Sequence, residues 1–222
     1  MRLYFCTQME KDILQQMRAN YAMGTLNRDE VNPSPFHQFE LWFEQAVKSE
    51  VNEPNAFVLA TCTADGKPSA RVVLMKGFDD DGLVFYTNYD SRKGKELSEN
   101  PNISLVFNWL DLQRQVRMEG TVKKVSEEES IQYFNSRPFE SQVSAAVSPQ
   151  SQEIESKKDL QEKAKQLMIG GRHDVMKPKE WGGYIVNINY FEFWQGRPNR
   201  FHDRVAYKKD GGDKWEVVTL AP

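Results

Sequence analysis

The chain has 222 residues, with 29 Lys and Arg against 32 Asp and Glu, which gives a net charge of −3. This balance argues against a globally basic nucleic-acid-binding protein, and 39% hydrophobic residues, with 12% aromatic, argue against disorder. The longest apolar runs are far shorter than the ~20 residues of a membrane-spanning helix, and residues 3–6 are too few for a signal-peptide core. With only Cys6 and Cys62 as cysteines, these features predict a globular protein of the cytoplasm.

Two helices are predicted in the first fifty residues. From Glu10 to Met23, apolar residues recur at helical spacing, and Gly24 is placed to end the helix. A second helix is predicted after Ser34, whose side chain can cap it, with Pro35 at the first helical position. Its apolar face consists of Phe36, Phe39, Trp42, Phe43, Ala46 and Val47.

Beyond residue 55 the pattern changes to short strands separated by turn residues. Residues 64–67, 79–82 and 210–213 have the composition of hairpin turns. Such a succession of strands favours an antiparallel sheet or barrel over a parallel sheet. The predicted strands are residues 56–62, 69–78, 83–87, 103–110, 112–125, 184–195, 199–208 and 215–220.

Three further helices are predicted among these strands. The first begins after Ser91, and the second begins after Ser126, which forms a capping box with Glu129. The third spans residues 149–168, and the glycine-containing residues 170–183 are predicted to form an ordered loop. Together the elements predict the α+β class, with helices beside a barrel-like antiparallel sheet.

The sequence lacks the motifs of several common chemistries. It contains no Walker A loop, no GxGxxG after a strand, no GxSxG and no HExxH. His37, His173 and His202 are isolated and neither cysteine belongs to a CxxC pair, which argues against a structural zinc site. An enzyme with this sequence is therefore expected to use a bound organic cofactor.

Positive charges occur inside apolar strand patterns, where an unpaired charge costs several kcal/mol. Arg71 begins the run RVVLMK, and Arg200, His202 and Arg204 alternate with other residues, so that all three are predicted to point to one face of a strand. Partner carboxylates of the chain, or solvent-exposed strand faces, would explain any one of them. The whole set favours bound phosphate groups, since each phosphate monoester carries about −1.5 to −2 charges. More than one phosphate is expected.

The segment FEFWQGRPNRFHDR, Phe191–Arg204, closely resembles the C-terminal signature of the pyridoxine/pyridoxamine 5′-phosphate oxidases. The resemblance extends over several ordered segments, from about Arg18 to the end of the chain. Phe201 stands where the family usually has an aliphatic residue, which is expected to alter packing under the substrate pocket. The other matching segments are Arg71–Lys76, Phe85–Asn88, Ser91–Lys93, Arg114–Gln115, Tyr133–Pro138, Trp181–Gly183 and Leu220–Pro222.

The resemblance implies a fold and an assembly. The fold would be an antiparallel split β-barrel with flanking helices, forming a single FMN-binding domain over residues 1–222. Residues 1–24 would include a helical segment that closes over the substrate. The protein would be a homodimer with FMN at the subunit interface, without a metal, a nucleic acid or a membrane as partner.

The resemblance also implies functional residues. Arg200 and His202 would be catalytic and would lie over the substrate. The other substrate-binding residues would be Arg18, Tyr21, Lys76, Tyr133, Arg137 and Ser141. FMN would be held by Arg71, Val72, Val73, Leu74, Tyr86, Thr87, Arg92, Lys93, Gln115, Gln150, Ser151, Trp194 and Arg204.

The position of Lys76 raises a geometric condition. Arg71 and Lys76 are five residues apart, so on a straight strand their side chains point to opposite faces. They can serve neighbouring ligands only if the strand bends, bulges or ends near Gly77.

The reaction that the resemblance implies is oxidation of pyridoxine 5′-phosphate or pyridoxamine 5′-phosphate to pyridoxal 5′-phosphate, in vitamin B6 biosynthesis and salvage. Molecular oxygen would be the electron acceptor and hydrogen peroxide the second product. Three alternatives stay open: another flavin enzyme on the same fold that uses a nicotinamide, a non-enzymatic carrier or sensor of flavin or pyridoxal phosphate, and a nucleic-acid-binding module. The last has its best support in Arg114 and Arg117 near Trp109.

Overall fold

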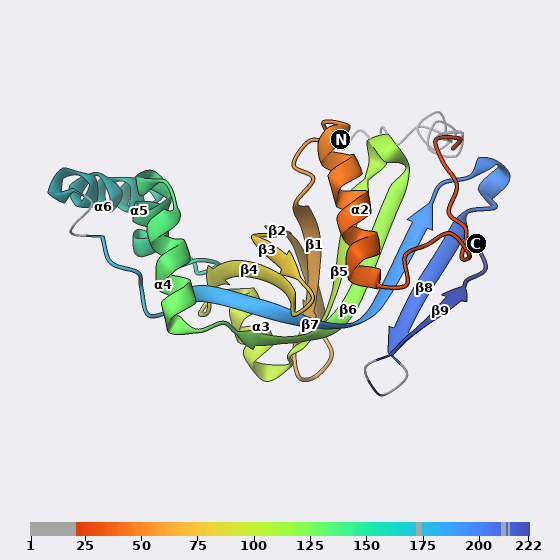
Figure 1. Cartoon of the computed structure of the whole chain (residues 1–222). Coiled ribbons are helices and arrows are strands. Elements are labelled where there is room, and N and C mark those ends of the chain that lie inside the picture. Colours follow the sequence, from red (N-terminus) through yellow and green to blue (C-terminus); the bar gives the residue numbers. More distant parts are fainter. Residues whose placement is uncertain (1–20, 172–174, 210–211, 213) are drawn as a thin grey trace, which may run out of the picture.

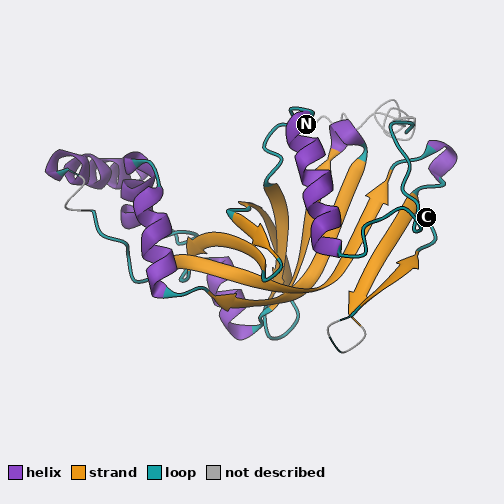
Figure 2. Ribbon diagram, viewed as in Figure 1, coloured by secondary structure: helices purple, strands orange, loops and turns teal. Residues whose placement is uncertain are grey.

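A computed structural model describes residues 21–171, 175–209, 212 and 214–222. A curled antiparallel sheet runs through the molecule, with the helices of residues 127–170 at one end and the helix of residues 35–48 packed along the sheet (Figures 1 and 2). Among the described residues, no helix has the length and apolar character needed to cross a membrane.

The strands are β1 Ala56–Cys62, β2 Pro68–Leu74, β3 Gly77–Asp79, β4 Gly82–Asn88, β5 Asn102–Trp109, β6 Arg114–Lys124, β7 Trp181–Gln195, β8 Asp203–Lys209 and β9 Trp215–Thr219. The helices are α2 Pro35–Lys48, α3 Arg92–Glu99, α4 Glu127–Ser136, α5 Phe139–Val147 and α6 Lys157–Gly170, with 3₁₀ turns at Leu110–Leu112 and Pro198–Arg200.

The long strand β7 organises the sheet. On one edge it pairs with β6 over residues 184–195. On its other edge, β4 pairs with residues 181–186 and β8 pairs with residues 190–195. The sheet order is β2-β1-β5-β6-β7-β4-β3, and β8 and β9 continue from the second half of β7. Because two strands share one edge of β7, the sheet divides into two arms, which confirms the predicted α+β class and split, barrel-like antiparallel sheet (Figure 1).

The irregularity that lets β7 curl is a bulge in its pairing with β6. The register shifts between Glu119 and Gly120, and a Cβ at Gly120 would lie 2.2 Å from the carbonyl oxygen of Asn187. A side chain therefore cannot be accommodated at this position without moving the backbone. Bulges of this kind bend a strand and increase its twist.

Two apolar clusters stabilise the fold. The larger one packs α2 against the sheet: the ring of Phe39 lies 5.0 Å from that of Phe107, and Trp42 lies 5.3 Å from Phe193. The smaller cluster joins α4 and α5 to the start of β7 and includes Phe134, Val143, Val175 and Trp181. This second cluster holds the two helices in place beside the cavity described below.

The predicted helix caps are confirmed, because each depends only on neighbouring residues. The Ser34 hydroxyl accepts a hydrogen bond from the His37 backbone N–H at 3.4 Å, and α2 begins at Pro35 as expected. Ser91 caps α3 by accepting from the Gly94 N–H at 3.2 Å, and Ser126 caps α4 by accepting from the Glu129 N–H at 3.0 Å.

One predicted strand, residues 69–78, is two strands in the structure. β2 pairs with β1, whereas β3 pairs with β4. Between them the Met75 N–H donates to the Asn55 carbonyl at 2.9 Å and the Lys76 N–H donates to the Val84 carbonyl at 2.8 Å. The chain therefore passes at these two residues from β2, at one end of the sheet order, to β3, at its other end, which meets the geometric condition set by Lys76.

The predicted strand over residues 199–208 begins only at Asp203. Asn199 has φ 57° and Arg200 has φ 64°, so a 3₁₀ turn replaces the start of the strand. The prediction that Arg200, His202 and Arg204 alternate on one strand face is therefore wrong, because only Arg204 lies in β8.

The remaining differences concern helix limits. α5 was not expected, and α6 begins at Lys157 after its cap Ser156 instead of at residue 149. β7 begins at Trp181, inside the predicted loop 170–183. Most of the helix predicted over residues 10–23 lies outside the described residues, and residues 21–23 are not helical.

Candidate active site

A cavity of about 510 Å³ opens between β2, β4 and the helices α4 and α5. Its walls come from segments that are far apart in the sequence: the end of β2, the middle of β4, the first turn of α3 and the α4–α5 connection. Predicted site residues that line the cavity are Val72, Val73, Leu74, Lys76, Tyr86, Thr87, Lys93, Tyr133, Arg137, Ser141 and Gln150, and we call this set the first half-site.

One wall of the first half-site is aromatic. The rings of Tyr86 and Tyr133 stack at 3.9 Å and 20°, and Trp181 continues the stack 5.5 Å from Tyr86 at 13°. Gly183 permits this approach, because a Cβ there would lie 2.8 Å from Tyr86. Burial, followed by the charge and hydrogen bond of Glu129, raises the pKa of Tyr86 far above its ordinary value, so this phenol stays protonated. The wall presents flat, uncharged surface to the cavity.

Arg137 brings an unsatisfied positive group to the cavity. Its Nη1 atom is buried and has no hydrogen-bond partner within the described part of the chain. The guanidinium lies over the Trp181 ring at 4.8 Å, and burial lowers the pKa of Arg137. A buried donor without a partner costs free energy, and an oxyanion is the acceptor that a guanidinium binds best. The geometry therefore favours an anionic ligand beside Arg137.

Lys93 supplies a second cation to the cavity. Its side chain is buried, and its Nζ donates to Thr87 Oγ1 at 3.0 Å and to Gln150 Oε1 at 3.4 Å. Burial, and then the nearby positive charge of Arg71, lower the pKa of Lys93 to about 8. Neither contact carries a negative charge, so Lys93 too is suited to an anionic ligand.

Arg71 and Arg92 lie behind Lys93, and both contact the buried carboxylate of Glu96. Arg71 Nη2 is 3.3 Å from Glu96 Oε2, and Arg92 Nε is 2.9 Å from Glu96 Oε1. Arg71 also donates through Nη1 to Leu59 O at 3.2 Å. Arg71 therefore has a carboxylate partner within the chain, which the sequence did not reveal, but this one carboxylate is shared with Arg92 and leaves the group positively charged.

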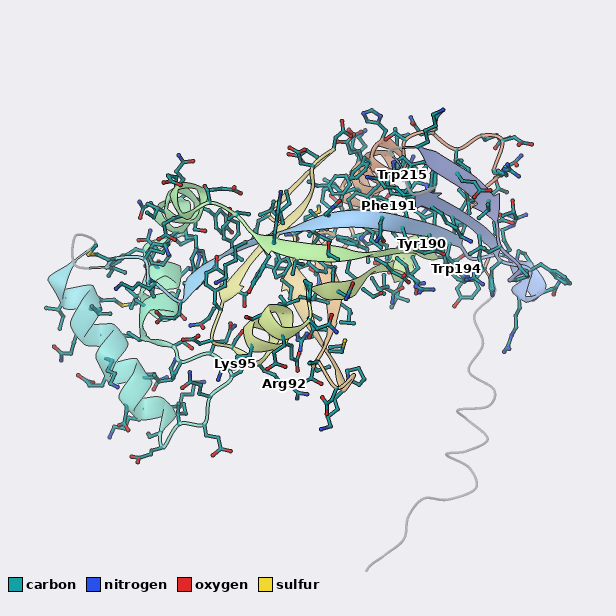
Figure 3. The ribbon with its side chains drawn as sticks, turned by 90° about the horizontal axis from the view of Figure 1, so that it is seen from below. Arg92, Lys95, Tyr190, Phe191, Trp194 and Trp215 are labelled. Carbon is teal, nitrogen blue, oxygen red and sulfur yellow. The ribbon has the colours of Figure 1, made fainter. Side chains whose placement is uncertain are left out.

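A second group of predicted site residues gathers at the other end of β7. Gln115, Trp194 and Arg204 are register neighbours across β6, β7 and β8. The Trp194 ring lies 4.6 Å from His202 and 5.8 Å from Tyr21, and Figure 3 shows Trp194 at the end of the sheet away from Arg92. We call Tyr21, Gln115, Trp194, Arg200, His202 and Arg204 the second half-site.

The orientation of His202 is fixed by the turn before it. The backbone N–H of Arg197 donates to His202 Nδ1 at 3.1 Å. Because Nδ1 accepts this hydrogen bond, the neutral imidazole carries its proton on Nε2. The Arg197 side chain in turn contacts Asp203 at 3.3 Å and donates to the Gly24 carbonyl at 2.8 Å, which holds the segment before α2 against this turn.

Arg204 also has a partner carboxylate within the chain. Glu192, 2% exposed, accepts from Arg204 at 2.8 and 2.9 Å through Oε1, and from Arg117 at 3.1 Å through Oε2. A third bond runs from Arg204 Nη1 to the Ala221 carbonyl at 2.7 Å. The expectation that Arg204 needs an external anion is wrong, because Glu192 already compensates its charge.

This network predicts a stability effect. Glu192→Gln removes the charge shared by two guanidinium groups and is expected to lower the free energy of unfolding by about 1–3 kcal/mol. Glu119→Gln is the matched control, because Glu119 also contacts Arg117 at 3.1 Å but its side chain is 46% exposed, and ion pairs open to solvent contribute less than about 1 kcal/mol. Urea unfolding of both variants measures the difference; equal midpoints would contradict a special role for Glu192.

The two half-sites do not meet on one chain. Trp181 borders the first half-site and Trp194 belongs to the second, and they lie near opposite ends of β7. At about 3.3 Å per residue the strand separates them by roughly 40 Å along its length. Ser151, exposed and at φ 65°, does not line the cavity, and Arg18 lies outside the described residues.

Comparison with known proteins finds one family model that matches the part of the chain with the first half-site and another that matches its C-terminal part. Residues 43–167 match the family model "Pyridoxamine 5′-phosphate oxidase", and residues 181–222 match "Pyridoxine 5′-phosphate oxidase C-terminal dimerisation region". The pyridoxine/pyridoxamine 5′-phosphate oxidase of Gloeothece citriformis is 52% identical over 94% of this chain and 98% of its own. The chain belongs to the pyridoxine/pyridoxamine 5′-phosphate oxidase family.

Another family member and two solved structures are also similar to this chain. The pyridoxine/pyridoxamine 5′-phosphate oxidase of Salinibacter ruber is 49% identical over 94% of this chain and 99% of its own. The structure of PhzG from Burkholderia lata, in complex with tetrahydrophenazine-1-carboxylic acid, superposes with a TM-score of 0.87 at 29% identity, covering 92% of this chain and all of that one. An FMN-binding protein from Nostoc punctiforme shares the fold, with a TM-score of 0.69 at 15% identity over 86% of this chain and all of that one. Enzymes of this oxidase family are FMN-dependent oxidoreductases.

Several residues of the site were not predicted. Trp181 lies within a matching segment but had no assigned role, and Ser144 and Ser148 on and after α5 line the cavity. Glu96 and Glu192 are the partners of the predicted arginines. The pairing of Glu96 with Arg92 could have been predicted from sequence, since the two residues are four apart in a capped helix. The pairing of Glu192 with Arg204 depends on how β7 and β8 pair, which sequence spacing does not show.

Proposed function

We propose that this member of the family oxidises pyridoxine 5′-phosphate or pyridoxamine 5′-phosphate to pyridoxal 5′-phosphate, with FMN as cofactor, O₂ as electron acceptor and hydrogen peroxide as product. This activity belongs to the biosynthesis and salvage of vitamin B6. The observation that carries the proposal is the cavity of the first half-site. Arg137 and Lys93 line this cavity, and neither has a carboxylate partner among the described residues. Two phosphate esters, one on the cofactor and one on the substrate, would complement these charges.

FMN fits the donors that one side of the cavity offers. Lys93, with Arg71 and Arg92 behind it, would hold the phosphate, and the backbone of Val72 to Leu74 together with Tyr86 and Thr87 would line the ring system. When bound, FMN supplies the hydride acceptor and passes the electrons to O₂. Further contacts would come from Gln115, Gln150, Ser151, Trp194 and Arg204.

The substrate would occupy the part of the cavity next to α4 and α5. Arg137 and Lys76 would bind its phosphate, and Tyr133 and Ser141 would contact its ring and phosphate. Arg200 and His202 would lie over the substrate and orient the carbon that is oxidised, with His202 Nε2 facing it, because Nδ1 is occupied by the Arg197 N–H. Arg18 and Tyr21 would close over the bound substrate.

The separation of the half-sites supports a homodimer in which each site is shared. A two-fold axis would place the first half-site of one protomer against the second half-site of its partner, twice per dimer. The match of residues 181–222, which include Trp194, His202 and Arg204, to a dimerisation region supports the same arrangement.

The decisive assay is oxygen uptake by the purified protein loaded with FMN. With pyridoxine 5′-phosphate as the only reductant, O₂ consumption, hydrogen peroxide and pyridoxal 5′-phosphate are expected in equal amounts. A requirement for NADH or NADPH would instead indicate a flavin reductase, and tight ligand binding without turnover would indicate a carrier or sensor.

The nucleic-acid alternative loses its structural support. Arg117 contacts Glu192 and Glu119, each at 3.1 Å, and Arg114 packs over the Trp42 ring at 4.4 Å. Trp109, which was expected to accompany them, is 2% exposed. These side chains do not present the combination of free charge and accessible rings that binds single strands.

The pKa of Lys93 predicts how FMN binding depends on pH. Lys93 titrates at about 8 in the ligand-free protein, and a bound phosphate favours its charged form. FMN affinity is therefore expected to be nearly constant between about pH 7 and pH 8, where the phosphate is doubly charged, and to fall as the pH rises above 8, by up to about ten-fold per pH unit. Titrations between pH 7 and 9.5 measure this. Lys93→Arg stays charged and should show no such fall; an identical fall in that variant would contradict the assignment.

The single-domain organisation with a closing N-terminal segment stays a prediction, because residues 1–20 lie outside the described part of the chain. A cytoplasmic location is proposed as well; its support is the free thiol of Cys62.

A further inference from the structure

Glu96 is a buried acidic side chain beside the residues proposed to hold the cofactor phosphate. It lies in the last turn of α3, and its side chain is 4% exposed. Its Oε2 accepts hydrogen bonds from the hydroxyls of Thr61 and Ser69, the latter at 2.6 Å, and contacts Arg71 Nη2 at 3.3 Å. Its Oε1 accepts from Arg92 Nε at 2.9 Å. One carboxylate thus joins β1, β2 and both ends of α3.

This environment keeps Glu96 ionised. Burial raises the pKa of its carboxyl, but the hydrogen bonds from Ser69, Thr61, Arg92 and Arg71 outweigh burial and lower the pKa to about 2. The charge of Glu96 is therefore permanent in the pH range where the enzyme would work.

The charges of this cluster match a phosphate monoester. Arg71, Arg92 and Lys93 contribute three positive charges and Glu96 one negative charge, so the cluster has a net charge of +2. A phosphate monoester carries about −1.5 to −2 near neutral pH. The cluster would therefore be neutralised by one such group, without a surplus of buried positive charge.

Resting on the proposed function, we propose that Glu96 is a positioning residue for the cofactor phosphate. It fixes the guanidinium groups of Arg71 and Arg92 in one arrangement before FMN binds. Long side chains held in place by a supporting carboxylate lose less conformational entropy on binding than free ones do. Supporting contacts of this kind keep a binding group within the narrow geometry that it needs.

Charge and positioning predict opposite results when Glu96 is neutralised. By charge alone, Glu96→Gln leaves a net charge of +3 and should bind phosphate more tightly. By positioning, the variant should bind it less tightly. The amide oxygen can replace Oε2, which accepts from three groups, so the amide NH₂ would face Arg92 Nε–H. Two donors then face each other, and Arg92 is released.

The experiment compares FMN with riboflavin, which lacks the phosphate. Quenching of flavin fluorescence by the FMN-free full-length protein gives the Kd of each ligand. For Glu96→Gln we expect the Kd of FMN to rise at least ten-fold while that of riboflavin changes less than two-fold. Glu99→Gln is the matched control, since Glu99 is exposed on the same helix and the change in net charge is identical. Its Kd for FMN should stay within two-fold of wild type.

Each outcome has a distinct meaning. Unchanged or tighter FMN binding by Glu96→Gln overturns the positioning role, as does an equal loss for FMN and riboflavin, which would indicate a general structural defect. If wild-type protein itself binds riboflavin as tightly as FMN, the proposed phosphate site is wrong, whatever Glu96 does. Should Glu96→Gln fail to fold, Glu96→Asp decides: it keeps the charge but is too short to hold both arginines, so a selective loss of FMN supports positioning and full retention overturns it.

Discussion

Arg137→Ala is expected to lower kcat/KM for pyridoxine 5′-phosphate by about 10² or more, mainly through KM. The buried Nη1 of Arg137 has no partner among the described residues, and Arg137 lines the cavity in which we propose that the substrate phosphate binds. A charged hydrogen bond in a site shielded from water contributes about 1.5–3 kcal/mol, and a guanidinium can form two. Because the phosphate does not itself react, loss of a contact to it should weaken binding more than it slows the chemical step.

The same variant separates binding from folding. Nη1 makes no hydrogen bond among the described residues, and the guanidinium contacts the Trp181 ring, so Arg137→Ala should lower the free energy of unfolding of the FMN-free protein by no more than about 2 kcal/mol. Steady-state kinetics, together with unfolding in urea, test both statements. Wild-type kcat/KM, or a loss of activity that follows a loss of stability, would count against the assignment of Arg137 to substrate phosphate.

Arg200→Ala is expected to lower kcat by about 10² while FMN stays bound. Arg200 is exposed and sits at φ 64° in the turn Pro198–Arg200, next to Asn199 at φ 57°. Two consecutive non-glycine residues in the left-handed region cost free energy, and such strain is common where a side chain is held for function. In the proposed homodimer, the exposed Arg200 would contact a ligand held by the partner protomer.

Lys208→Ala serves as the matched control for Arg200, because Lys208 is also an exposed cation at this end of the molecule. It should retain wild-type kcat. The visible absorption of bound flavin should be the same in both variants and in wild type. Normal turnover by Arg200→Ala at saturating substrate would contradict its catalytic assignment.

The parts of the fold that could be predicted from sequence are those fixed by short-range chemistry. Caps at Ser34, Ser91 and Ser126 depend on residues within three positions, and the strand pattern from residue 56 onward depends on alternation and turn residues. The break between β2 and β3 was not predicted, because it arises when the chain changes its pairing partner from β1 to β4. No local pattern records that change.

The same distinction applies to the site. The first half-site contains only part of the residues that the family resemblance implied, and the cavity brings together those from β2, β4 and the α4–α5 connection. The expectation that cations in apolar strands indicate bound phosphate groups was only partly right. Arg71 and Arg204 occur in apolar strands because Glu96 and Glu192 are nearby, and those partners come from other elements. Two cations that line the cavity, Lys93 and the half-buried Arg137, have no carboxylate partner among the described residues, and sequence patterns alone did not distinguish them.

The central claim is that one active site is built from the first half-site of one protomer and the second half-site of its partner. Co-expression of differently tagged Arg137→Ala and Arg200→Ala chains, followed by tandem affinity purification, yields the heterodimer. In that dimer one site carries both substitutions and the other carries neither, so we expect about half of the wild-type activity per dimer, well above the sum of the two homodimers. Activity no higher than that of the two variant homodimers would show that each chain builds its site alone and would contradict the account.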